Sequence, residues 1–226
     1  MDRETYALLE DYMQSCMTDS AHDKEHVYRV LNNALVLAEG EQVDYDILIT
    51  ATLLHDIGRG EQIADPSLCH AAVGSEKAYR FLTENGFPQA FAKRVKDCIR
   101  THRFRKSDQP QSLEAKILFD ADKLDVVGAI GIARTLAFKG TVAEPLYTRL
   151  ADGSVGDGSE EMPSFFREYK FKLEKLYDRF YTAKGTALAQ DRKKAAVSFY
   201  ESLYHEVCQF DMQGKMQLYN QLSRNN

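Results

Sequence analysis

Apolar residues recur at intervals of three and four through most of the chain, which is the spacing of helices with one buried face. No stretch shows the strict alternation of a half-buried strand, and no segment repeats. The pattern therefore predicts an all-α protein, a single-domain helical bundle over residues 1–226. Helices are expected over residues 2–17, 23–39, 45–56, 67–85, 88–103 and 113–139, and in two segments between residues 165 and 222.

Three stretches interrupt this pattern. Residues 59–67 contain Gly60 and Pro66 and are expected to form a loop, and residues 104–112 are expected to form a second, basic loop. Residues 140–164 contain several Gly and Pro residues without a sustained period, so we expect a long loop or lid. The small residues at 128–133 either let another backbone approach closely or mark a bend between two helices.

Composition and charge limit the function classes. Of the 226 residues, 44% are hydrophobic, which is enough for a sizeable core. The 29 Lys and Arg residues against 34 Asp and Glu residues give a net charge of -5, which offers no basic field for nucleic acid. The Cys residues lie far apart without a paired motif, as in a protein with reduced thiols. Because the chain shows no signal-peptide core and no apolar run of about 18 residues, we expect a cytoplasmic protein without a membrane partner.

One polar pair ends the most apolar of the expected helices. His55 and Asp56 follow directly on the apolar residues 49–54, and Gly58 and Gly60 are expected to stop the helix there. Neighbouring helix residues point about 100° apart, so these two side chains reach a common point only through a small object such as a metal ion. The alternative is a helix-end His that bonds to local carbonyls beside a solvated Asp. The doublet alone leaves both interpretations open.

A further His lies beside the buried stripe of residues 23–39. His26 adjoins that stripe and is expected to face inward. His22 precedes it by four residues, a spacing that zinc proteases use, but Asp23 stands where their catalytic Glu would be. We therefore do not favour a protease site.

Three carboxylates lie close together in the stretch 113–139. Asp120, Asp122 and Asp125 would raise one another's pKa unless cations neutralise them. Asp122 and Asp125 share a helix face because they are three residues apart.

Taken in order, His26, then His55 and Asp56, then Asp122 resemble the H…HD…D signature of the HD superfamily of metal-dependent phosphohydrolases. The segments that carry the resemblance are His22-Asp23-Lys24-Glu25-His26, Leu53-Leu54-His55-Asp56-Ile57-Gly58 and Asp120-Ala121-Asp122-Lys123-Leu124-Asp125. They span about residues 20–140, which would form the helical core, followed by the lid at 140–164 and the C-terminal helices at 165–222. The family fold is all-helical, in agreement with the pattern.

The resemblance implies four metal ligands, His26, His55, Asp56 and Asp122, with His55 and Asp56 as the catalytic pair. Asp122 is preferred to its acidic neighbours because the family ligand precedes the basic residue of an A-D-[KR]-L segment. Two imidazoles and two carboxylates suit Mn²⁺, or Co²⁺, Ni²⁺ and Fe²⁺, better than Mg²⁺. We expect one ion, since the spacing of further His residues does not match dinuclear members.

A bound phosphate needs cationic or polar support. The candidates near the ends of the relevant helices are His70, His102, Arg59, Lys123 and Arg103, with Arg105 in the basic loop, and we place Asp125 with them.

The resemblance implies hydrolysis of a nucleotide, because the segment from Asp120 onward is similar to a compact branch that releases pyrophosphate from nucleoside triphosphates. The nearest alternative is a nucleoside monophosphatase or phosphodiesterase on the same metal. A non-catalytic nucleotide-binding module is a third interpretation, but such a module is expected to have lost ligands. Aromatic residues between 165 and 210 are expected in the core or on a homodimer surface.

Overall fold

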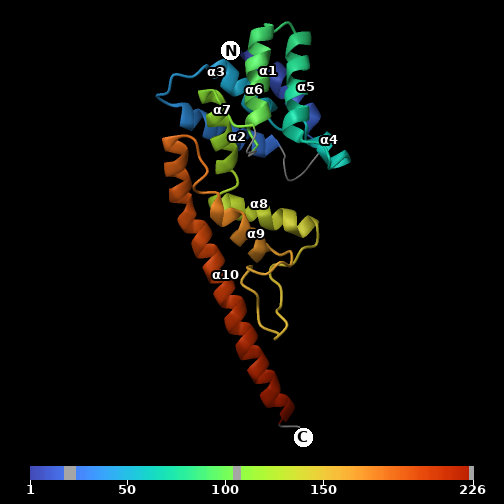
Figure 1. Cartoon of the computed structure of the whole chain (residues 1–226), viewed down its shortest axis with the longest axis vertical. Helices are drawn as coiled ribbons and strands as arrows, with labels where there is room; N and C mark the ends of the chain where they lie inside the picture. Colours follow the sequence, from blue (N-terminus) through green and yellow to red (C-terminus); the bar gives the residue numbers. More distant parts are fainter. Residues whose placement is uncertain (18–23, 104–107, 224–226) are drawn as a thin grey trace. The chain divides into compact units, whose positions relative to one another are not determined.

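The computed structural model describes residues 1–17, 24–103 and 108–223 (Figure 1). These residues form helices, turns and one isolated bridge between Arg149 and Val155, without a strand. The predicted all-α class is therefore confirmed. The chain divides into two compact units, Met1–Asp125 with Phe180–Leu188 and Val126–Arg179 with Ala189–Asn226. The predicted boundaries near residues 140 and 164 stay a prediction.

The first unit is built around α3 (Tyr45–Leu54), most of which is buried. The Asp44 side chain accepts a hydrogen bond from the Ile47 N–H and begins this helix. Because α3 is apolar on nearly all sides, it is covered by several neighbours. They are α1 (Arg3–Cys16), α2 (Lys24–Ala38), α6 (Gln89–Thr101) and α7 (Leu113–Leu124).

Two helices follow the end of α3, where the sequence predicts a loop and one helix. α4 (Arg59–Ala64) occupies most of the predicted loop 59–67, so that prediction is wrong. The Lys77 ammonium stabilises this short helix by donating to the Ile57 carbonyl and to Glu61. α5 (His70–Glu84) starts three residues later than expected, lies beside α6 (Figure 1), and is followed by Gly86 at a φ of 82°.

The stretch 113–139 forms two helices, so the small residues at 128–133 follow a break between helices. α7 ends at Leu124 and α8 (Gly128–Thr141) begins after three intervening residues. Gly128 has a φ of 67°, and a Cβ there would lie 2.8 Å from the Arg192 Cβ. Only glycine satisfies both conditions, which is why the small-residue run begins with one.

The second unit contains α8, α9 (Phe165–Phe171), a 3-10 turn at Leu173–Lys175 and most of α10 (Ala183–Ser223). Its buried aromatic residues are Phe165, Phe166, Tyr169, Tyr177 and Tyr200, which places these members of the aromatic set in the core. Residues 142–164 contain no helix, as expected, but they have internal bonds such as Gly156 N–H to the Thr148 carbonyl at 2.9 Å. No helix among the described residues is long and apolar enough to cross a membrane.

Candidate metal centre

Two of the buried histidines stand at helix ends and are held by their own helices. His55 is the C-cap of α3, and its Nδ1–H donates to the Thr52 carbonyl at 2.7 Å. His102 is the C-cap of α6, and its Nδ1–H donates to the Ile99 carbonyl at 2.6 Å. Carbonyls in the last turn of a helix lack the usual i+4 partner, and each ring donates to one of them. A carbonyl can only accept, so both rings carry the proton on Nδ1 and present a lone pair at Nε2.

The other two histidines obtain the same tautomer from side chains. His70 Nδ1 lies 2.7 Å from Gln62 Oε1, and Gln62 Nε2 donates to the Leu68 carbonyl, which fixes the orientation of the amide. His26 Nδ1 lies 2.7 Å from an Asp125 oxygen, on the ring side opposite Nε2. All four imidazoles are therefore held through Nδ1 and turn Nε2 the other way.

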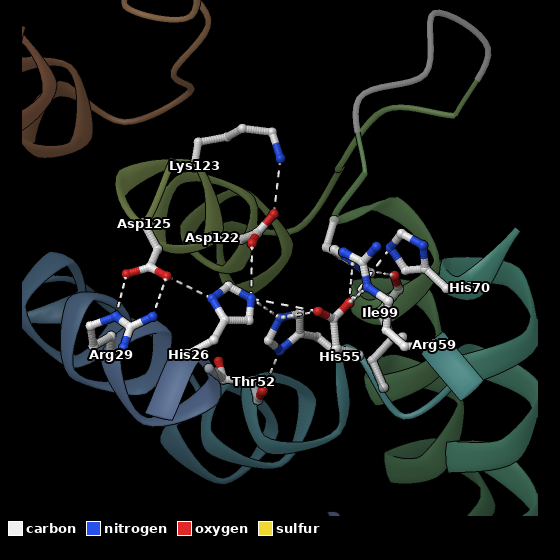
Figure 2. A network of polar contacts seen from close by, with 12 residues as sticks. His26, Arg29, Thr52, His55, Arg59, His70, Ile99, Asp122, Lys123 and Asp125 are labelled. Carbon is white, nitrogen blue, oxygen red and sulfur yellow. Dashed lines mark hydrogen bonds and ion pairs between the residues drawn. The ribbon is translucent and has the colours of Figure 1, made fainter. Parts of the chain in front are cut away.

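These Nε2 atoms converge on the Asp56 carboxylate. The distances to its oxygens are 3.5 Å from His26, 3.7 Å from His55, 3.5 Å from His70 and 3.6 Å from His102. All five residues are buried, with at most 2% of each exposed. Figure 2 shows His26 between Asp125 on one side and His55 on the other, with Asp122 nearby.

The donor set fits a metal ion. Bonds of about 2.0–2.2 Å place two ligands of one ion roughly 3 to 4 Å apart, which matches these separations and the 3.5 Å from His26 Nε2 to Asp122 Oδ1. Among the described residues, the two Asp56 oxygens and His70 Nε2 have no hydrogen-bond partner, although Arg59 forms an ion pair with Asp56 Oδ1. Two groups could hold an ion, His26 with His55 and Asp56, and Asp56 with His70 and His102. They share Asp56.

Two glycines bring the Asp56 turn against α5. A Cβ at Gly58 would lie 2.4 Å from the His70 carbonyl oxygen and 2.6 Å from the Gly74 nitrogen. A Cβ at Gly74 would lie 3.2 Å from the Gly58 nitrogen. The two backbones approach this closely because neither residue has a side chain, and the approach places His70 beside Asp56.

The carboxylates of the site are held ionised. Burial opposes the charge of Asp56, but His55 and Arg59 outweigh it and keep its pKa well below the ordinary value. Burial also opposes the charge of Asp122, and Lys123 and His26 likewise hold its pKa well below the ordinary value.

The imidazoles differ in how they titrate. Burial lowers the pKa of His55 to about 4 and that of His70 to about 2. Burial acts in the same direction on His26, but the bond to Asp125 and the nearby Asp56 raise its pKa overall. Neutral His55 and His70 offer lone pairs at neutral pH, as metal ligands require.

The three neighbouring carboxylates, two on α7 and Asp125 at its C-cap, make different contacts. Asp122 faces His26, and Asp125 lies behind the same ring. Asp120 instead accepts from the Tyr181 and Thr182 backbone N–H groups and from the Thr182 hydroxyl, all within the first unit. The geometry therefore supports the choice of Asp122 among the three. Asp125 contacts the candidate ligand His26. The sequence instead predicts Asp125 among the residues that contact the substrate.

Two of the cations that were expected to bind phosphate contact the carboxylates of this group. Arg59 Nε is 3.0 Å from Asp56 Oδ1, and Lys123 Nζ is 2.9 Å from Asp122 Oδ2. Arg103 is half-buried, with Nη1 3.8 Å from Cys69 Sγ at the start of α5. The candidate cation Arg105 lies outside the described part of the chain, as do His22 and Asp23 of the protease-like spacing that was not favoured.

Sequence reasoning missed the groups behind the imidazoles. The carbonyls of Thr52 and Ile99 lie three residues before a helix-end His, a spacing that the sequence does contain. Gln62 lies in a segment expected to be a loop, and Arg29 contacts Asp125 across 96 positions of the chain. The sequence contains no signal for either of these two contacts.

Comparison with known proteins agrees with this geometry. The sequence matches the HD domain over residues 24–127. YpgQ, an uncharacterized protein of Bacillus subtilis, is 32% identical over 202 residues, which cover 87% of this chain and 90% of YpgQ. The crystal structure of Bacillus subtilis YpgQ in complex with ADP matches with a TM-score of 0.70 at 28% identity, over 89% of this chain and 97% of that chain. The crystal structure of a predicted HD superfamily hydrolase from an uncultured Thermotogales bacterium matches with a TM-score of 0.59 at 30% identity, over 90% of this chain and 91% of that chain.

The matched domain contains every residue of the H…HD…D pattern. It begins two residues before His26 and ends beyond Asp125, and so includes His55, Asp56 and Asp122. The likeness to YpgQ extends over most of both chains. The chain belongs to the HD-domain family.

Proposed function

We propose that this protein is a divalent-metal-dependent phosphohydrolase that cleaves nucleoside triphosphates to a monophosphate and pyrophosphate. The observation that carries the proposal is the buried set of Nε2 atoms around an Asp56 carboxylate without hydrogen-bond partners among the described residues. Arg59 forms an ion pair with one Asp56 oxygen, but the four Nε2 atoms and the second oxygen of Asp56 remain costly in a folded protein unless a further cation satisfies them. Membership of the HD family supports the same activity class.

His26, His55, Asp56 and Asp122 would hold one ion. Two nitrogen and two oxygen donors suit Mn²⁺ best among the candidates, with Co²⁺, Ni²⁺ and Fe²⁺ as alternatives. When bound, the ion supplies Lewis-acid activation of the scissile phosphate and of the attacking water. The Nδ1–H bonds of His26 and His55 keep both rings in the tautomer that binds it.

The second pair of imidazoles takes part differently. His70 and His102 present Nε2 to the other oxygen of Asp56, and a neutral Nε2 accepts a hydrogen bond. With one ion bound, these rings would orient the attacking water, because a phosphate oxygen offers no proton to accept. Metal analysis showing two ions per chain would instead assign the second ion to Asp56, His70 and His102.

Charge at the site favours a triphosphate. Arg59, Arg103 and Lys123 are cationic side chains at or beside the candidate ligands, and a pyrophosphate leaving group has charge for them to stabilise. A relative was crystallised with ADP, which supports a nucleotide as the substrate class.

The test is a substrate panel with product identification. Purified protein with Mn²⁺ is given ribo- and deoxyribonucleoside tri-, di- and monophosphates and cyclic dinucleotides. Triphosphates should turn over fastest, with monophosphate and pyrophosphate as products. Inorganic phosphate released mainly from monophosphates would replace the proposal with a phosphatase, and opened cyclic dinucleotides would replace it with a phosphodiesterase. No turnover with any metal would favour a binding module.

Substitution of a single arginine tests whether positive charge at the site stabilises the triphosphate. Arg103→Gln should lower triphosphate turnover about 10-fold or more, because hydrogen bonds to charged groups contribute roughly 1.5–3 kcal/mol, while metal occupancy stays intact. Arg100→Gln is the matched control, since Arg100 lies at the end of α6 in an exposed pair with Asp108. Equal activity of both variants would remove Arg103 from the substrate contacts.

A further inference from the structure

His26 differs from the other buried histidines in the group that holds its Nδ1. His55 and His102 donate to backbone carbonyls and His70 to a side-chain amide, but His26 donates to the Asp125 carboxylate. A bond to an ionised acceptor is shorter and roughly twice as strong as one between neutral groups. His26 is therefore the imidazole whose orientation and basicity depend most on a single side chain.

Asp125 is in turn held by an arginine. Arg29 Nε lies 2.7 Å from Asp125 Oδ1, and Arg29 Nη2 lies 3.0 Å from Asp125 Oδ2. Arg29 follows His26 by three residues on α2, so one face of that helix presents the imidazole and the guanidinium to the same carboxylate. Asp125 is 1% exposed, and the two-point contact with Arg29 offsets the cost of burying its charge.

One turn of α7 supplies groups to both nitrogens of the same ring. Asp122 Oδ1 lies 3.5 Å from His26 Nε2, while Asp125 Oδ2 lies 2.7 Å from His26 Nδ1. The backbone N–H of Asp125 bonds to the Asp122 carbonyl and closes this turn. The spacing between the candidate ligand and the carboxylate behind the ring is thus fixed by the end of one helix.

We propose that Asp125, clamped by Arg29, is a positioning residue that orients His26 for metal binding and strengthens it as a ligand. The inference rests on the proposed metal site. Removal of a carboxylate that bonds to a ligating imidazole typically costs 10- to 100-fold in metal affinity. Asp125 thereby acts through His26 and has no contact with substrate.

The test measures metal affinity separately from activity. Chelator-stripped protein is titrated with Mn²⁺ in competition with a fluorescent chelator, for the wild type, Asp125→Asn and Asp120→Asn. Asp120 is the matched control, because it is a buried carboxylate of the same helix whose partners are Tyr181 and Thr182. Asp125→Asn should raise the Mn²⁺ dissociation constant about 10- to 100-fold, and Asp120→Asn should leave it unchanged even if its melting temperature falls.

Two further measurements distinguish a positioning role of Asp125 from a general loss of structure in the variant. With Co²⁺ in saturating amount, the visible absorption should change in Asp125→Asn and not in Asp120→Asn, because only the first alters a ligand. Arg29→Lys, which keeps the charge but loses the planar fork, should raise the dissociation constant by less than Asp125→Asn does.

The outcomes separate this inference from the proposed function. If the wild type binds neither Mn²⁺ nor Co²⁺, the metal site and the inference both fail. If the wild type binds and Asp125→Asn has the same dissociation constant, only the positioning role is overturned. If Asp125→Asn does not fold, an unchanged Arg29→Lys dissociation constant and Co²⁺ spectrum overturn it.

Discussion

At the scale of single residues, the candidate site is organised by what lies behind the imidazoles. Each Nδ1–H is already bonded, to Thr52, Gln62, Ile99 or Asp125, so no ring needs to reorient before it offers Nε2. Ligands held in advance lose little rotational freedom when an ion binds. The arrangement is therefore better suited to binding a metal than to donating hydrogen bonds to a phosphate.

The buried neutral His55 predicts how the metal-free protein responds to acid. Its pKa is about 4 in the folded protein and 6.5 in the unfolded chain, so between these values the unfolded state binds more protons. The free energy of unfolding should therefore fall as the pH drops from 6.5 to about 4. Chemical denaturation of chelated protein at several pH values measures this, and His55→Gln should show a shallower fall. A free energy of unfolding that stays level across this window in the wild type would disagree with a buried neutral His55.

Two neighbouring carboxylates of α7 predict opposite phenotypes. Asp122→Ala should lose most of its metal, because Asp122 Oδ1 lies 3.5 Å from His26 Nε2. Asp120→Ala should keep its metal and lose about 1–3 kcal/mol of stability, since the buried Asp120 carboxylate accepts from two backbone N–H groups that lose their partner. Metal analysis and denaturant titration of the two proteins decide the matter, and a metal-free Asp120→Ala beside a metal-loaded Asp122→Ala would reverse the assignment.

At the scale of elements, the site depends on how closely the turn after α3 approaches α5. Gly58→Ala would place a Cβ 2.4 Å from the His70 carbonyl oxygen, so the turn must move away from α5. We expect a loss of about 1–3 kcal/mol in stability, typical of overpacking, together with weaker metal binding because the turn that moves carries the candidate ligand Asp56. Melting temperature and Mn²⁺ titration measure the two effects.

The matched control for this change is Gly140→Ala. Gly140 lies in α8, and a Cβ there would meet nothing within 4 Å, so the substitution should be neutral or slightly stabilising. If Gly58→Ala behaves like Gly140→Ala, the close approach is not what positions His70.

The helices could be predicted where a long apolar period identifies them, as in α2, α3 and α6. α4 was missed because six residues beside two glycines are too short to show a period, and its stability comes from Lys77, which is distant in sequence. The order of His26, His55, Asp56 and Asp122 was readable from the sequence, and the structure brings these four together. The pairing of Asp125 with His26 was not readable, because it joins residues 99 positions apart.

At the scale of the whole molecule, residues 140–164 stay the candidate lid. They lie in the second unit and contain a tight turn in which the Leu150 N–H donates to the Ser154 carbonyl at 2.9 Å. If this segment closes over bound nucleotide, shortening it at the turn should change the Michaelis constant far more than Mn²⁺ affinity. Steady-state kinetics with a triphosphate and Mn²⁺ titration compare the two, and unchanged kinetics would make the segment a mere connection.

The buried histidines and carboxylates should form a metal site that is required for hydrolysis. Its most direct test is the metal content and triphosphatase activity of purified wild type, His55→Ala and Asp56→Ala, each chelated and then reloaded with Mn²⁺. We expect about one ion per wild-type chain with activity restored, and neither metal nor activity in the two variants. A wild type that binds no metal, or full activity in His55→Ala, would contradict it.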